Sequence, residues 1–315
     1  MARRPRIHYP GALYHVILRG NAQQEVFFED KDRHRFCLLL QEGLDRYEHR
    51  IHAFCLMINH IHLALQSGEV PLSRFMQNLG FRYTRWINWR LKRSGHLFQG
   101  RFKAVLVDAD SYLLQLVRYI HLNPVRAGLV NNPDEHCWSS HMAYCGQEII
   151  PWLTTETVWS RFSATRHQAI GAYRHFVLAG MEEGHRAEFH KGMGEDCRLL
   201  GDDEFVEKAL TQAQDQFQGR RFLTVQKIID QLCCTYCIEK AELEKPGRDR
   251  LLTELRGMAA WLVVETGCGT LAELGRETGR DVTTLSAAAK RMQLRAKNDA
   301  RLESLRESLL QRLSE

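Results

Sequence analysis

The sequence has no long hydrophobic run, and this absence excludes one class of protein. No apolar stretch of the 315-residue chain is long enough to span a bilayer, and the basic start is not followed by an apolar signal core. We therefore expect no membrane partner and a cytoplasmic protein. The nine cysteines, an odd number, fit reduced thiols in that compartment.

Two further absences concern motifs. Cys234 and Cys237 form a Cys-x-x-Cys, but no second pair lies at zinc-finger spacing, so we assign them no metal. No phosphate-binding glycine loop is present, which argues against a helicase region. The rest of the composition is ordinary for a globular protein, with 44% hydrophobic and 26% charged residues. The net charge of +5 permits a polyanionic partner without requiring one.

The most informative stretch is Asn59-His60-Ile61-His62-Leu63. In a helix, residues two apart point to nearly opposite sides, whereas in a strand they project from the same face. His60 and His62 would then lie side by side while Ile61 enters the core. Two adjacent imidazoles can hold a divalent metal if a third ligand arrives from elsewhere. The alternative is a pair of ordinary histidines on a half-buried strand.

Residue patterns predict an α+β domain over residues 1–150. The order of the predicted strands and helices is β-α-β-β-α-β-α, and the first six elements match a ferredoxin-like arrangement with an antiparallel sheet. Helices would cover one face of this sheet and leave the histidine face available for chemistry. The patterns predict strands at 12–19, 51–58, 61–66 and 101–107, and helices from Asp30 or Asp32 to 47, at 71–92 and at 112–122.

The last of these helices carries a second candidate group. Tyr119 and Asn123 are four residues apart and therefore share a helical face. Pro124 ends or kinks the helix directly after Asn123. A tyrosine hydroxyl and an amide are thus presented together at a helix end. The alternative is a tyrosine packed on the sheet and an asparagine cap.

Together these motifs resemble the single-tyrosine HUH transposases, and most closely the REP-associated tyrosine transposases. The resemblance covers roughly residues 5 to 145. The matching segments are Tyr14-His15-Val16, Arg19-Gly20-Asn21, His60-Ile61-His62, Leu97-Phe98-Gln99-Gly100-Arg101-Phe102-Lys103, and Tyr119 within Arg118-Tyr119-Ile120-His121-Leu122-Asn123-Pro124. Relatives often carry proline at the position of Ile58, a difference that affects the hairpin and not the ligands.

The resemblance implies an HUH endonuclease fold and a role for each matched side chain. His60, His62 and Asn123 would bind the metal, and Tyr119 would be the nucleophile. The N/O ligand set with an exchangeable position suits Mg²⁺ or Mn²⁺ in use, although two imidazoles would hold Zn²⁺ or Co²⁺ more tightly. The implied reaction cleaves and rejoins single-stranded, hairpin-bearing DNA through a 5′-phosphotyrosine.

Cationic and aromatic residues alternate in the helix at 71–92 and beyond it, a mixture suited to phosphates and bases of a single strand. The alternative is an amphipathic helix with a solvated basic face and a buried aromatic face. The expected DNA contacts in this domain are Arg82, Arg85, Arg90, Arg93, Arg101, Lys103 and Arg126.

Residues 151–200 resemble a helical connector, in which His185 and His190 lack partner spacing and are expected at the surface. Residues 201–315 form an all-α pattern that ends in a helix-turn-helix. The Gly-Arg-Asp-x-Thr-Thr of residues 279–284 is similar to the C-terminal DNA-binding domain of the replication initiator DnaA. Arg280, Thr283 and Thr284 would then contact duplex DNA. The alternative is a structural helical bundle.

Two other functions are consistent with these motifs. One is a non-catalytic DNA-binding regulator on the HUH scaffold, and the other is a nickase of the replication-initiator or relaxase type. The sequence leaves open whether Tyr119 serves the histidines of its own chain or those of a second copy in a homodimer.

Overall fold

In the computed structural model, the described residues are 6–193, 196–247, 249–296 and 298–314. The chain divides into two compact units, Met1–Ala213 and Gln214–Glu315. The boundary lies inside helix α9 (Asp203–Phe222), and residues 151–200, predicted as a separate connector, fold with the first unit. Within the described ranges, no helix has both the length and the hydropathy that a membrane span requires.

The first unit is built on a five-stranded sheet in the order β2-β3-β1-β4-β5. The first four strands pair antiparallel, which confirms the predicted α+β class and strand positions. The fifth strand is short, pairs parallel with β4, and comes from the predicted connector. The strands are β1 (Leu13–Arg19), β2 (Arg50–Leu56), β3 (His60–Gln66), β4 (Lys103–Val107) and β5 (Leu199–Leu200).

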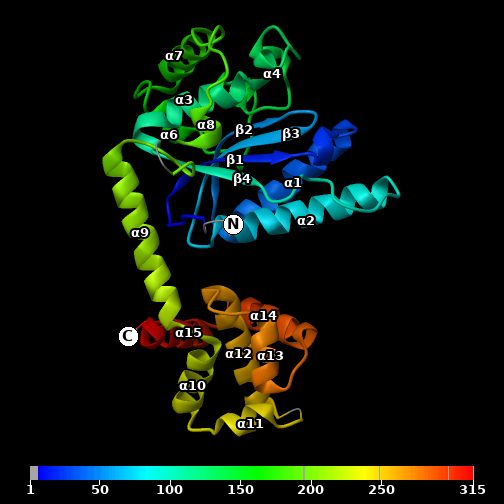
Figure 1. Cartoon of the computed structure of the whole chain (residues 1–315), viewed down its shortest axis with the longest axis vertical. Coiled ribbons are helices and arrows are strands. Elements are labelled where there is room, and N and C mark those ends of the chain that lie inside the picture. The colour runs from blue at the N-terminus through cyan, green and yellow to red at the C-terminus, as the bar shows by residue number, and fades with distance from the viewer. Residues whose placement is uncertain (1–5, 194–195, 248, 297, 315) are drawn as a thin grey trace. The chain divides into compact units, whose positions relative to one another are not determined.

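Helices cover both faces of this sheet. α1 (Asp30–Tyr47) and α2 (Leu72–Arg90) lie on one side, and α3 (Ala109–His121) lies on the other (Figure 1). The prediction that the histidine face stays open was therefore wrong, since α3 packs against β2 and β3 on that face. The shorter elements are η1 (Asn21–Gln23), α4 (Asn123–Arg126), η2 (Pro133–Glu135), α5 (His141–Tyr144), α6 (Glu156–Trp159), α7 (Arg166–Leu178) and α8 (Glu188–Lys191).

The core between the sheet and α1–α2 is aromatic. Phe36, Phe75 and Tyr83 are fully buried, and the rings of Phe36 and Tyr83 meet edge to face at 5.1 Å. The Tyr83 hydroxyl donates a hydrogen bond to the carbonyl of Val26 at 2.7 Å, so its polar end is satisfied inside the core. This core fixes the two helices against the sheet from the side opposite to the histidines.

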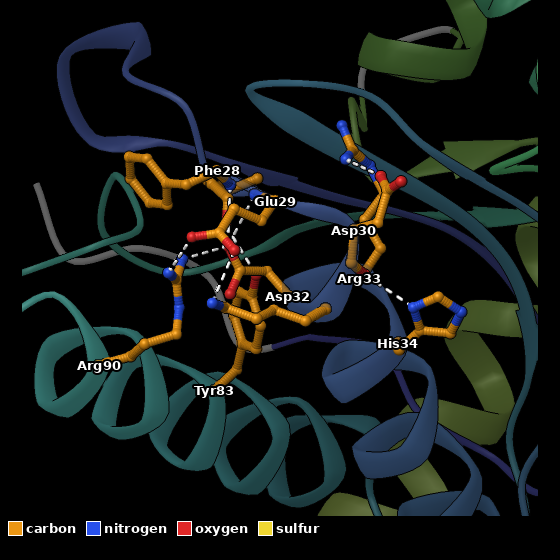
Figure 2. Close-up of polar contacts among 10 residues, drawn as sticks. Phe28, Glu29, Asp30, Asp32, Arg33, His34, Tyr83 and Arg90 are labelled. Carbon is orange, nitrogen blue, oxygen red and sulfur yellow. Dashed lines mark hydrogen bonds and ion pairs between the residues drawn. The ribbon is translucent and has the colours of Figure 1, made fainter.

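The start of α1 is joined to the end of α2 by a buried carboxylate (Figure 2). Glu29, not Asp30 or Asp32, is the N-cap residue, and it forms a capping box with Asp32. Asp32 is completely buried, and its Oδ2 accepts hydrogen bonds from the backbone N–H of Phe28 and Glu29. Arg90 of α2 donates to the same oxygen at 2.5 Å and to Glu29 Oε1 at 2.7 Å.

The second unit is a helical bundle around α12, whose residues 255–263 are all buried. Thr270 and Glu273 form a capping box at the start of α13, and Gly279 ends that helix with φ +62°. The predicted helix-turn-helix is present as α13, the turn at Gly279, and α14. The helices are α10 (Val225–Tyr236), α11 (Lys240–Glu244), α12 (Arg250–Thr266), α13 (Leu271–Thr278), α14 (Val282–Ala296) and α15 (Ala300–Ser314).

We expect Arg90→Ala to destabilise the first unit by about 3 kcal/mol, because it leaves the buried Asp32 carboxylate without its cation. Arg82→Ala is the matched control on the same helix. Arg82 pairs with Glu42 at the surface, and such pairs contribute at most about 1 kcal/mol. Denaturant unfolding of both variants tests this, and equal losses of stability would contradict it.

Candidate active site

The pairing of β3 with β1 places the histidines beside cationic side chains. Residues opposite each other on antiparallel strands project from the same face. His60 lies opposite Arg19, while His62 lies opposite Ile17, which in turn lies opposite Lys103 of β4. The rings of His60 and His62 are 4.9 Å apart, so the predicted side-by-side arrangement is confirmed.

Each histidine has a hydrogen-bond partner on its Nδ1 atom. His60 Nδ1 lies 2.7 Å from Oδ1 of Asn59. His62 Nδ1 lies 2.8 Å from Nε2 of His15, which belongs to β1. His62 and His15 are almost completely buried, and their rings stack at 5.0 Å. The partners of Nδ1 orient both rings and leave Nε2 as the nitrogen that can act as a ligand.

Tyr119 of α3 lies against this histidine cluster in the same chain. Its ring is 6.3 Å from the ring of His62 and 5.9 Å from that of His15. One face of the phenol packs on Phe189 at 4.9 Å, and the Arg126 guanidinium lies 4.2 Å from the ring centre. Tyr119 is only 3% exposed, so its ring is held in one place.

Asn123 lies one helical turn after Tyr119, as predicted, but it begins α4 and does not end α3. Its Nδ2 donates to the carbonyl of Tyr119 at 2.9 Å. This contact leaves Oδ1 as the acceptor atom of the amide, which is the atom that a hard metal ion would use. Asn123 is buried in the same part of the first unit as Tyr119.

Residues from α8 complete the cluster. His190 Nε2 lies 2.6 Å from the Tyr119 hydroxyl, in a hydrogen bond that is only partly buried. The prediction that His190 is a surface residue without a partner was therefore wrong, although the neighbouring His185 is exposed as expected. Nothing in the local spacing of His190 signals this role, since 71 residues separate it from Tyr119.

A glycine permits this position of α8. Gly192 follows the helix with φ +65°, and a Cβ atom there would lie 2.3 Å from the carbonyl oxygen of Leu199 in β5. The chain can therefore reverse tightly and return to the sheet only with glycine at this position. The reversal ties α8 to the edge strand and so to the histidine face.

Burial keeps the imidazoles of the cluster neutral. It lowers the pKa of His60 and of His15 to about 4 and that of His190 to about 3. Burial also raises the pKa of Tyr119, which keeps the phenol protonated at neutral pH. Positive charge on this face comes from Arg19, Lys103 and Arg126 instead, and the first and last lie close enough to lower the pKa of Tyr119 in part.

The other predicted contact residues of the first unit fall into two groups. Arg82 and Arg90 are paired with carboxylates on α1 and at its start. Arg85, Arg93 and Arg101 instead line a groove of about 910 Å³ between α2 and the segment at 96–102. Phe81 and Trp89 border this groove and are 66% and 72% exposed, so the groove combines flat rings with cations.

A separate group of possible metal ligands lies outside the predicted site. Asp134, His141 and Cys145 offer ligand atoms within 4.8 Å of one another. His141 Nε2 is 2.8 Å from Asp134 Oδ1, and Asp134 also pairs with Arg174. The Tyr173 hydroxyl contacts Nδ1 of both His141 and His121, and Nε2 of His121 contacts the Ser140 hydroxyl. His121, to which the sequence assigns no role, thus belongs to a buried polar network.

In the second unit, the predicted residues lie at the start of α14. Thr283 and Thr284 are both exposed, and Asp281 accepts hydrogen bonds from the Thr284 N–H at 2.8 Å and from its hydroxyl at 2.5 Å. Arg280 donates to the carbonyl of Lys245 at 2.7 Å. Asp281 therefore caps the start of α14 through Thr284, while Thr283 faces solvent.

Residues 9–123 match the family model described as "Transposase IS200 like". This segment is therefore similar to the IS200-like transposases. It contains the histidine pair, Tyr119 and Asn123, but not α8.

One solved structure, described as a REP-associated tyrosine transposase bound to a REP hairpin, is similar at 15% identity with a TM-score of 0.41. That alignment covers 49% of this chain and 92% of the other. A comparison with curated proteins found no match.

We expect the neutral, buried imidazoles to make stability fall as the pH drops below 6.5. The unfolded chain binds protons at that pH, whereas folded His15 binds its proton only near pH 4. Stability is therefore fully present above pH 6.5 and is lost progressively down to about pH 4. For His15 alone the loss at pH 5 is on the order of 2 kcal/mol.

The measurement is the free energy of unfolding at pH 7.5 and pH 5, with EDTA present, for wild type and His15→Gln. The variant lacks one titrating imidazole, so its stability should depend less on pH. Identical pH dependence of the two proteins would show that His15 does not carry this effect.

Proposed function

We propose that this protein is a metal-dependent, single-tyrosine transposase that cleaves and rejoins single-stranded DNA. One observation carries the proposal, namely that the nucleophile and the histidine pair converge within one chain, with the rings of Tyr119 and His62 6.3 Å apart. The match of residues 9–123 to an IS200-like transposase family supports it. The enzyme thus uses its own tyrosine with its own histidines.

The chemistry of the donor set fits a divalent metal. His60 and His62 each have Nδ1 engaged by a partner, and the Asn123 amide has Nδ2 engaged by the backbone. The remaining atoms are two imidazole nitrogens and one amide oxygen, a mixed set for Mg²⁺ or Mn²⁺ in use, although two imidazoles would hold Zn²⁺ more tightly. When bound there, the ion would polarise a non-bridging oxygen of the scissile phosphate.

Tyr119 and His190 supply the nucleophile and its base. The phenol stays protonated at neutral pH, and His190 Nε2 accepts its hydrogen bond at 2.6 Å. As the Tyr119 oxygen bonds to phosphorus, its proton passes to His190, the bond from phosphorus to the 3′-oxygen breaks, and that oxygen takes up a proton. The arriving phosphate is anionic and raises the pKa of the imidazole, which improves it as a base.

Two surfaces would bind the substrate. Arg19, Lys103 and Arg126 give the histidine face the positive charge that a phosphodiester requires. The groove beside α2 would hold neighbouring nucleotides, with Phe81 and Trp89 as stacking platforms and Arg85, Arg93 and Arg101 as cations. Arg101 of the groove and Lys103 of the histidine face are two residues apart in the sequence, just before β4 and at its start.

The second unit would bind duplex DNA through α14. Its exposed face carries Thr283, Lys290 and Arg291, and Arg280 lies in the preceding turn. Capping by Asp281, which accepts hydrogen bonds from the N–H and the hydroxyl of Thr284, keeps the start of this helix rigid for that contact. A chain that has one unit for duplex DNA and another for single strands suits a protein that recognises a hairpin and cleaves next to it.

We expect Tyr119→Phe to abolish covalent attachment of a labelled single-stranded hairpin oligonucleotide in the presence of Mn²⁺. Tyr112→Phe, on the same helix, should retain it. Removal of the metal with EDTA should also stop adduct formation by the wild type. Denaturing electrophoresis separates the adduct, and an adduct that persists in Tyr119→Phe would refute the assignment.

Retained oligonucleotide binding in wild type without cleavage or adduct, under all metal conditions, would favour a regulator that keeps the HUH scaffold. The binding measurement therefore accompanies each cleavage assay. Its control is duplex DNA of the same sequence, which should not be cleaved.

We expect His190→Ala to lower the cleavage rate by about 100-fold or more, because the phenol loses the base that takes its proton. His185→Ala is the matched control, since His185 is an exposed neighbour whose ring lies 4.8 Å from that of His190. Single-turnover rates at saturating oligonucleotide are the measurement. Equal rates for the two variants would remove His190 from the reaction.

A further inference from the structure

The Nδ1 atom of His62 contacts the Nε2 atom of another histidine, so the direction of that hydrogen bond decides which nitrogen of His62 can bind a metal. A neutral imidazole carries one proton, on either Nδ1 or Nε2. Only the nitrogen without the proton can be a ligand. The tautomer of His62 is therefore as important to the site as the position of its ring.

The contacts of His15 determine that direction. Its Nδ1 lies 2.8 Å from the carbonyl oxygen of Phe189, and a carbonyl can only accept. His15 must therefore carry its proton on Nδ1. His15 is completely buried, and an imidazole buried in this way stays neutral, so its Nε2 atom carries no proton and has a lone pair. That lone pair accepts the proton of His62 Nδ1, and Nε2 of His62 is left as the free donor atom.

We propose that His15 is a positioning residue which, held by the Phe189 carbonyl of α8, fixes His62 in the tautomer that binds the divalent metal. The inference rests on the proposed function, because it assumes that His62 is a metal ligand. It assigns a role to β1 and to a helix that lies outside residues 9–123.

The two ends of this relay are fixed by different parts of the fold. His15 lies opposite Ala64 in the sheet, which makes His62 its diagonal neighbour on the same face. Phe189 belongs to a helix of one turn, where the carbonyl groups near the C-terminus have no partner within the helix. His15 satisfies one of them, while the reversal at Gly192 holds the helix in place.

His60 reaches the same tautomer by a different route. The Asn59 amide donates through Nδ2 to the carbonyl of Gln23 at 3.2 Å, which directs Oδ1 toward His60 Nδ1. His60 therefore also presents Nε2. Both histidines thus present Nε2, which Asn59 ensures for His60, and His15 with the Phe189 carbonyl ensures for His62.

The first test measures the tautomer without metal. In full-length protein labelled with ¹⁵N-histidine, the ring signals of His62 are identified by their loss in His62→Ala. We expect a protonated Nδ1 and an unprotonated Nε2 in wild type. A proton on Nε2 of His62 would overturn the inference and leave the proposed function standing.

The second test measures the affinity for Mn²⁺ by titration calorimetry of the full chain. His15→Leu should weaken binding by about 10- to 100-fold, the usual effect of losing a residue that orients a metal ligand. His15→Gln, which places an amide oxygen where Nε2 accepts the proton, should restore binding to within a few-fold of wild type.

His52→Leu is the matched control for packing. His52 is also buried, on β2, which pairs with β3, and also contacts one backbone carbonyl and one side chain, those of Thr154 and Gln66. Its loss should lower the melting temperature without changing Mn²⁺ affinity. Unchanged affinity in His15→Leu refutes the inference alone, whereas unchanged affinity in His62→Ala refutes the metal site of the proposed function as well.

Discussion

The antiparallel pairing of β1 with β3 is the constraint on which the site depends. Side chains alternate between the faces of a strand, so a shift of β3 by one residue would move His60 and His62 to the opposite face, away from His15. In the observed register, His15, His60 and His62 share one face and Ile61 and Leu63 share the other. The hydrophobic face fixes this register, because its side chains are buried against the aromatic core beneath α1 and α2. The energy that buries ordinary leucines and isoleucines therefore also sets the geometry of the imidazoles.

The histidine face of the sheet is covered by α3 and α8, which are separate in the sequence from the strands that carry the histidines. Two neutral histidines and an apolar sheet surface cannot remain open to water without cost, and α3 and α8 cover them. The covering helices bring chemistry with them, since α3 carries Tyr119 and α8 carries Phe189 and His190. The match to the family model ends at residue 123, so Phe189 and His190 lie outside it. On the proposed function, α8 both covers this face and carries the base that acts on Tyr119.

The sequence predicts local relations well and distant ones poorly. Alternation around Ile61 is enough to place His60 and His62 on one face, and the four-residue spacing places Tyr119 and Asn123 one turn apart, as the structure confirms. Neither pattern can predict the contact of His190 with Tyr119, because that contact depends on the chain reversal at Gly192, which places α8 against the sheet. The same limit applies to Arg85 and Arg90, which look alike in the charge pattern of α2. Only the position of the buried Asp32 shows that Arg90 is committed to the fold while Arg85 lines the groove.

On the proposed function, the charges around the site explain why its metal ligands are neutral side chains. His60, His62 and Asn123 bring no negative charge to compensate a divalent cation, and Arg19, Lys103 and Arg126 add positive charge nearby. On the proposed function, the missing negative charge is supplied by the phosphodiester of the substrate. Metal and DNA then each lower the electrostatic cost of binding the other, and by thermodynamic linkage this coupling is reciprocal. A site of this composition is poorly suited to hold its ion tightly in the absence of DNA, and it reaches full electrostatic balance only when the scissile phosphate is in place.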